Sequence, residues 1–198
     1  MTLTTKLEAI NQMLLAIGAS PVNSLDTNSN VDVAQAKTLL DDVSREFQSA
    51  GWNFNTEVDV PLTRDANKEI LLAENAARVD IAPEDVPLDT EPMQRGSKLY
   101  DTKNRRYTWD EDLKAEIVYL LEWELLPEPA RNFVAKSAAR RFQEKVLGSE
   151  KVSQFTRDDE QRAWTNFVAF EENTGDYNVL QAPEVFAALA RRVPLHFS

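Results

Sequence analysis

The chain has 198 residues, 42% of them apolar, with no cysteine and a single histidine, His196. This composition excludes disulfides, thiolate metal sites and cysteine nucleophiles, and a catalytic triad would have to use a histidine at the chain end. The formal net charge is −11, opposite in sign to that of a general nucleic-acid-binding protein. We therefore expect no cofactor and no metal.

The length suits one domain, or one domain with a large excursion. The unbroken apolar runs, such as that at residues 117–121, are too short for a membrane span. The first eleven residues lack the basic and apolar blocks of a secretory signal. We expect a protein that is made in the cytoplasm without a membrane anchor and that stays there or is carried in an assembly.

Two helices are predicted at the start of the chain. Thr5 and Glu8 have the spacing of a capping box, and apolar residues then recur three and four apart until Gly18. Pro21 prevents that helix from resuming. A second apolar stripe predicts a helix over residues 31–50, which Gly51 ends.

The apolar period changes to two at residue 52. Residues 52–62 alternate strictly, which predicts a half-buried strand that Pro61 limits to an edge. Residues 69–81 are compatible with a short helix, and we favour a strand because their second half alternates. Residues 82–96 hold three prolines and four acids and are predicted to form an exposed loop.

A hairpin is predicted next, with its turn at residues 101–104. Residues 115–125 are apolar at every second position, and their β-branched and aromatic content favours a strand. Two long helices then follow, over residues 128–147 and 150–173, with Gly148 and Gly175 as stops. Residues 183–192 could form a last short helix.

These elements predict an α+β fold that is predominantly α. Residues 1–51 and 127–175 would form a helical bundle, residues 52–126 an antiparallel β-rich region, and residues 176–198 a tail with a short helix. Four of the five glycines follow predicted helices. A phosphate-binding loop needs closely spaced glycines before a helix, so we expect none.

Paired carboxylates offer one route to catalysis. Glu122 and Glu124 would share a face of the predicted strand, and Asp110 and Asp112 lie just before it. Two carboxylates at a suitable separation can hydrolyse a glycosidic bond. The alternative is that these side chains are the solvated parts of an amphipathic strand and a turn.

Aromatic and basic residues mark two candidate interfaces. Arg105 and Arg106 precede Tyr107 and Trp109, a combination found at protein interfaces and in single-strand nucleic-acid sites. We favour a protein interface because no wider basic field surrounds them. In the last long helix the aromatic residues, including Trp164 and Phe167, cover more than one face, which suggests a neighbouring subunit or a larger internal core.

Several motifs together resemble one family. The segments "AIGASPVNSLD", "NVDVAQA", "SAGWNFNTE", "LPEPARNFVAKSAARRFQEKVLGSEKV" and "GDYNVL" are similar to the tail tubular protein A family of short-tailed bacteriophages. The resemblance covers nearly the whole chain and is strongest at residues 16–60 and 120–180. It implies a helical bundle with an inserted or appended β-region.

The resemblance also implies a structural role in the virion tail, with synthesis in the host cytoplasm. Members of the family form a dodecameric ring beneath the portal, connect it to the tail nozzle protein and offer attachment sites for tail fibres. The ring helps to retain packaged DNA and lets it pass at ejection, without sequence-specific binding. A tail-associated polysaccharide hydrolase that uses the carboxylates above is the alternative, either alone or as a second activity.

Overall fold

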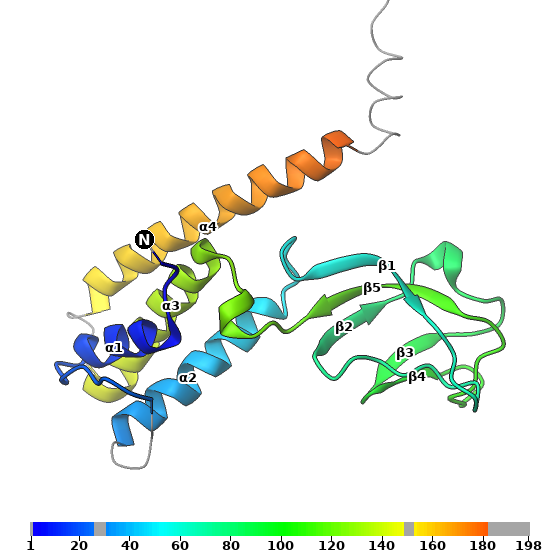
Figure 1. The fold of residues 1–198 in the computed structure, drawn as a ribbon, viewed down its shortest axis with the longest axis horizontal. Coiled ribbons are helices and arrows are strands. Elements are labelled where there is room, and N and C mark those ends of the chain that lie inside the picture. The colour runs from blue at the N-terminus through cyan, green and yellow to red at the C-terminus, as the bar shows by residue number, and fades with distance from the viewer. Residues whose placement is uncertain (1, 26–30, 149–152, 182–198) are drawn as a thin grey trace, which may run out of the picture.

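The computed structural model of the chain describes residues 2–25, 31–148 and 153–181. Within these residues two helices are followed by five strands and then by two more helices (Figure 1). The helices are α1 (Lys6–Ala16), α2 (Val31–Gln48), α3 (Glu128–Leu147) and α4 (Ser153–Gln181). The strands are β1 (Thr56–Leu62), β2 (Ala76–Asp80), β3 (Pro92–Arg95), β4 (Lys98–Asp101) and β5 (Leu113–Tyr119). The mixed α+β class is confirmed, with more residues in helices than in strands.

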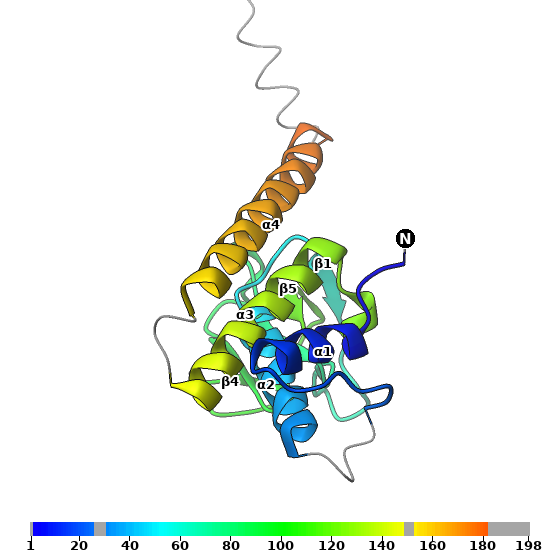
Figure 2. The ribbon, with the colours of Figure 1, turned by 90° about the vertical axis from the view of Figure 1, so that its left-hand side faces the viewer.

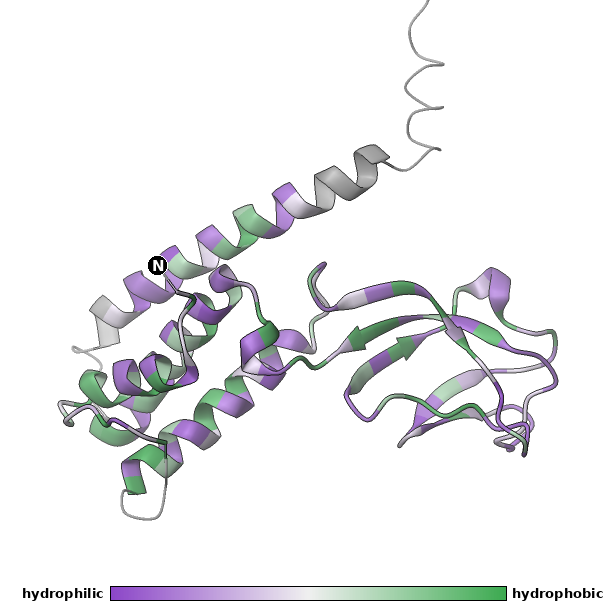
Figure 3. Cartoon of the chain, in the orientation of Figure 1, coloured by the Kyte–Doolittle hydropathy of each residue, from purple (hydrophilic) through white to green (hydrophobic). Residues whose placement is uncertain are grey.

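The four helices pack together with α3 at their centre, where it contacts α1, α2 and α4. Figure 2 shows α1 and α4 on different sides of α3. Their shared core includes Ile10, Leu40, Val134, Phe142 and Phe167, all essentially inaccessible to solvent. In Figure 3 the apolar stripes of these helices alternate with polar stripes, as expected for helices buried on one face.

The start of α1 agrees with its sequence. The Thr5 hydroxyl accepts a hydrogen bond from the Glu8 amide at 3.2 Å, and the Glu8 carboxylate accepts one from the Thr5 amide at 2.7 Å. This is the predicted capping box, which satisfies two amides that helix formation leaves without partners. Gly18 follows the helix with a positive φ of 79°.

The strands form two antiparallel sheets. One has the order β1-β5-β2, and the other is the β3-β4 hairpin. A second apolar cluster lies among them, with Ile70, Leu99, Trp109, Leu113 and Ile117 at its centre. No helix among the described residues is both long and apolar enough to cross a membrane.

The strand predicted over residues 52–62 begins only at Thr56. Trp52 and Phe54 lie in the turn before it and pack against the helical core instead. Within β1 the register shifts between Glu57 and Val60, and the alternation is broken there because Asp59 has φ of 57°. Val58 is consequently 68% exposed, although the period of two predicts it on the buried face.

The strand predicted over residues 115–125 ends at Tyr119, and residues 123–125 form a 3-10 helix. The buried Arg131 explains this turn, because its guanidinium donates to the carbonyls of Glu124 and Leu126 at 2.6 and 2.8 Å. Trp123 turns with the chain and donates to the Thr4 carbonyl at 3.0 Å. Its indole therefore belongs to the helical core rather than to the sheet.

The structure corrects two further predictions, on the loop at residues 82–96 and the end of α4, and agrees with the predicted turn at residues 101–104. The loop predicted over residues 82–96 contains a 3-10 helix at residues 83–85 and strand β3, which pairs with β4 across Gly96. The predicted turn at residues 101–104 is closed by an isolated bridge between Asp101 and Arg106. Helix α4 does not stop at Gly175 but continues to Gln181. The short helix predicted at residues 183–192 lies outside the described residues, as does His196.

Two buried amides join the helices to the sheet. Asn55 donates to the carbonyls of Gln48 and Tyr119 at 2.9 and 2.7 Å. The side chain of Gln48 accepts from the Leu121 amide at 2.7 Å and donates to the Leu121 carbonyl at 3.2 Å. These hydrogen bonds therefore hold in place the two chain segments that connect the helices to the β1-β5-β2 sheet.

Candidate assembly interface

An aromatic cluster fills the space between α2, α3 and α4. Phe167 is fully buried at its centre, with its ring centroid 4.8 Å from those of both Phe47 and Trp52. Phe133 and Trp164 lie 5.0 Å apart at the surface of this cluster and are only partly buried. The sequence pattern alone could not divide these aromatics into buried and accessible ones, because both kinds share the helical period.

Phe133 and Trp164 line a groove between α3 and α4. The remaining lining residues are Arg140, Arg157, Glu160 and Gln161. A smaller hollow between α2 and α3 also includes Phe133, together with Arg141. Accessible aromatic rings next to arginines are the composition that carries binding energy in protein interfaces. We call the hollow lined by Phe133, Arg140, Arg157, Glu160, Gln161 and Trp164 the α3–α4 groove.

Ion pairs hold the arginines on the rim. Arg140 pairs with Glu160 of α4 and, at 2.8 Å, with Glu144 of its own helix. The hydrogen bond that Arg140 donates to the Glu160 carboxylate contributes most to a raised pKa of Arg140, which stays charged. Arg157 lies 3.6 Å from Glu144 and is 61% exposed, so its guanidinium is the least engaged of these groups.

The four candidate catalytic carboxylates lie at opposite ends of β5. Asp110 and Asp112 precede the strand, while Glu122 and Glu124 follow it and lie at the 3-10 helix. Glu122 and Glu124 therefore do not share a strand face, which corrects the prediction. Seven strand residues span roughly 20 Å, whereas a glycosidase needs its two carboxyl groups within about 10 Å.

Asp112 is also in the wrong state for a general acid. Hydrogen bonds from the Arg64 side chain and amide lower the pKa of Asp112, and the Arg64 guanidinium lies 2.8 Å from its carboxylate. Asp110 pairs with Arg106 at 3.1 Å. A general acid requires a raised pKa, so this geometry does not favour hydrolysis and we do not propose it.

The predicted interface at residues 105–109 is divided by the structure. Trp109 is 1% exposed in the sheet core, where its indole donates to the Leu99 carbonyl at 3.2 Å, so it is not available to a partner. Arg105 is exposed at the tip of the turn, with a positive φ of 55°. Arg106 and Tyr107 are half-buried, and Tyr107 packs edge-on against Tyr100 at 4.7 Å.

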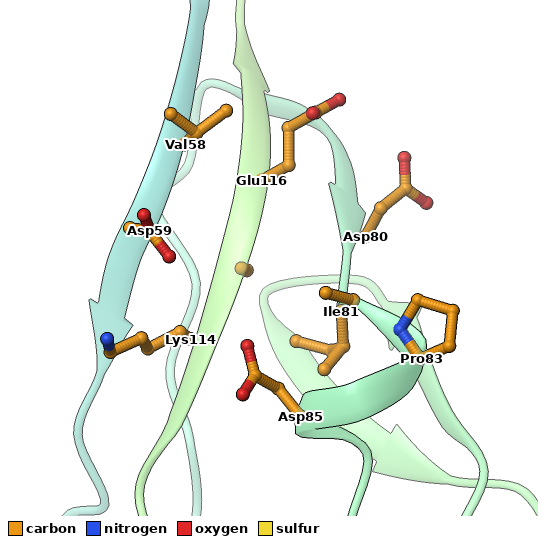
Figure 4. A pocket seen from close by; sticks show the side chains of 10 residues that line it. Val58, Asp59, Asp80, Ile81, Pro83, Asp85, Lys114 and Glu116 are labelled. Atoms are coloured by element: carbon orange, nitrogen blue, oxygen red, sulfur yellow. The ribbon is translucent and has the colours of Figure 1, made fainter. Parts of the chain in front are cut away.

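A third hollow, of about 290 Å³, lies against β1, β5 and the 3-10 helix at residues 83–85 (Figure 4). Asp59, Asp85, Lys114 and Glu116 are among the side chains around it. The sequence pattern does not indicate this hollow, because the Asp59 bulge that shapes it has no clear sequence signal. Across the described part of the chain, no group of three or more acidic or histidine side chains could hold a metal ion.

These features define a protein with mixed α+β architecture and an accessible aromatic groove, and comparison with known proteins assigns its class. A family model of the tail tubular protein matches residues 7–177. The chain therefore belongs to the tail tubular protein family and is a structural component of a phage tail. Tail tubular protein A of Klebsiella phage KP34 is 31% identical over 145 residues, which are 73% of this chain and 75% of that protein.

Proposed function

We propose that this chain is a ring-forming adaptor of the virion tail, which joins the portal to the tail nozzle and provides attachment sites for tail fibres. The match to the tail tubular family over residues 7–177 carries this proposal. The α3–α4 groove supports it, because a partly exposed Phe133 and Trp164 suit a subunit that is covered in an assembly. Synthesis in the host cytoplasm and a dodecameric ring belong to the same proposal.

We further propose a division of labour within the subunit. Residues 1–51 and 127–175 would act as a helical bundle, residues 52–126 as a β-region and residues 176–198 as a tail. Two separate apolar clusters support the first two units. The hydrogen bonds of Gln48 and Asn55 support a fixed angle between them.

The two candidate surfaces are assigned to different partners in this proposal. Trp164 contacts a neighbouring subunit, and the buried Phe167 supports its ring from below. Arg105, with Arg106 and Tyr107 beside it, lies in the turn that follows β4 in the β-region and is offered to the portal, nozzle or fibres. The distance between the two surfaces would let ring formation and partner binding proceed independently.

The acidic balance suits a ring through which DNA passes. With a net charge of −11, the subunit repels the phosphate backbone, so DNA can slide without being held. The proposal is therefore a channel wall that does not bind DNA sequence-specifically.

Phage particles made without this chain test the proposed function. We expect heads that lack tails and lose DNA, and infectivity restored by a plasmid-borne wild-type copy. Mass spectrometry of the particles would confirm that the capsid proteins are present at normal levels. Infectious, tailed particles without the chain would overturn the proposal.

A further inference from the structure

The outward face of α1 carries an exposed leucine, Leu15, and an acidic residue, Glu8, whose carboxylate Oε2 also accepts the capping-box hydrogen bond from Thr5. Ala9, Ile10, Met13 and Leu14 face the core. Glu8 and Leu15, seven residues apart, lie on the opposite face, and Leu15 is 59% exposed. Two full turns separate them, so they lie roughly 10 Å apart along one stripe, with Gln12 between them.

The α3–α4 groove carries a matching pattern. Arg157, Gln161 and Trp164 line it from α4, and they have the same offsets of four and seven residues. Arg157 and Trp164 are therefore also roughly 10 Å apart along their helix. If α1 of one copy lies parallel to α4 of another copy, Glu8 lies beside Arg157 and Leu15 beside Trp164. Opposite charges then face each other at one end of the contact, and two apolar side chains face each other at the other end.

The two faces lie on different sides of the subunit. The Arg131 side chain on α3 points to the α1 side, where it donates to the Thr4 carbonyl at 3.1 Å. Phe133, two residues further, is rotated by roughly 200° around α3 and lines the groove. Because each copy carries both faces on opposite sides of α3, one contact repeated head to tail can build a ring.

We propose that α1 of one copy docks into the α3–α4 groove of the next copy, with Leu15 against Phe133 and Trp164 and Glu8 beside Arg157. This inference rests on the proposed ring function and names the surfaces that build the ring. The occupant is a second copy of this chain. Charge and spacing support it: the exposed, weakly engaged Arg157 has an acidic partner at the matching position of α1.

Leu15→Asp tests the docking by placing a charge in the proposed contact. Leu15 is exposed in the single subunit, so the variant should melt at the wild-type temperature while its self-association weakens about tenfold or more. Sedimentation at several concentrations measures this change. Leu88→Asp is the matched control, because Leu88 is 96% exposed in the loop between the 3-10 helix at residues 83–85 and β3, and it should associate as the wild type does.

The absence of native cysteine allows a direct test of which surfaces meet. One protein carries Gln12→Cys and a second carries Gln161→Cys, the two positions that face each other in this register, and the two are oxidised alone and mixed. The mixture should give a cross-linked dimer, whereas each alone should give little, because the contact joins unlike surfaces. A mixture of Leu88→Cys with Gln161→Cys should give none.

The outcomes separate this contact from the ring itself. If the wild-type chain associates but Leu15→Asp associates equally well, or the mixed pair does not cross-link, this docking is wrong and the ring proposal stands. If the wild-type chain shows no self-association at any concentration, alone or with portal protein, the ring proposal fails and the docking falls with it.

Discussion

Asp101 is a fully buried carboxylate on which the turn after β4 depends. It accepts hydrogen bonds from the amides of Glu91, Lys103 and Asn104, and from the Asn104 side chain at 2.7 Å. Burial raises the pKa of Asp101, but these hydrogen bonds together outweigh burial and hold the pKa below its ordinary value. The carboxylate is therefore charged at neutral pH.

Asp101→Asn should lower the free energy of unfolding by about 1–3 kcal/mol at pH 7, because the amide leaves buried donors without their acceptor. Since folding lowers the pKa of Asp101, its charged carboxylate stabilises the fold fully at pH values above the pKa in the unfolded chain, about 3.9. This stabilisation is lost as the pH falls further through the folded pKa. Urea unfolding at pH 7 and below pH 4 should show the gap to wild type narrowing in acid. A gap that widens in acid would contradict this account.

Gly51 has both a positive φ of 80° and a crowded environment. A Cβ at this position would lie 3.0 Å from Cγ2 of Val118. Gly51→Ala should cost more than Gly18→Ala, because Gly18 has a similar φ of 79° but no atom within 4 Å of the added carbon. We expect about 1 kcal/mol for Gly18→Ala and about 1 kcal/mol more for Gly51→Ala in thermal or urea unfolding. Equal losses would show that the contact with Val118 does not matter.

At the scale of elements, the helices were predictable and the strands less so. Local signals such as the Thr5 capping box and Gly148 define helix ends, because they satisfy the helix's own backbone groups. The end of β5 depends instead on Arg131, which is distant from it in sequence. The Asp59 bulge likewise depends on pairing with β5, and a periodicity analysis has no access to such contacts.

The candidate surfaces were predicted in the same uneven way. The sequence singled out Trp164 from its aromatic excess, but Trp109 carries the same chemistry and is buried. Phe133 and Arg157 were missed, because they line the groove only after α3 and α4 pack together. Arg157 lies four residues before Gln161 and seven before Trp164. This spacing indicates a groove only once the fold places the three side chains along it.

Helix α4 continues through Gly175 to Gln181, beyond the other helices (Figure 1). Glycine in a helix interior is less favourable than alanine by about 1 kcal/mol. Gly175→Ala should therefore increase the helical signal at 222 nm and leave the core packing unchanged. Near-ultraviolet circular dichroism provides the control for packing. A decrease in helical signal would show that α4 ends near Gly175.

At the scale of the whole molecule, the charge predicts how the protein behaves toward DNA. With a net charge of −11, the purified chain should not bind labelled duplex DNA in a fluorescence anisotropy titration, even at low salt. Binding that weakens as salt is added would reveal a basic surface formed by the assembly, and it would contradict the proposal of a non-binding channel wall.

The central claim is that this chain forms a ring between the portal and the nozzle. Native mass spectrometry of tail complexes released from virions measures this directly, through the copy number of the chain and the proteins that stay bound to it. The account predicts a dodecameric ring of this chain that retains both the portal and the nozzle proteins. A tail complex that contains the chain in one or a few copies, or that lacks it, would contradict the account.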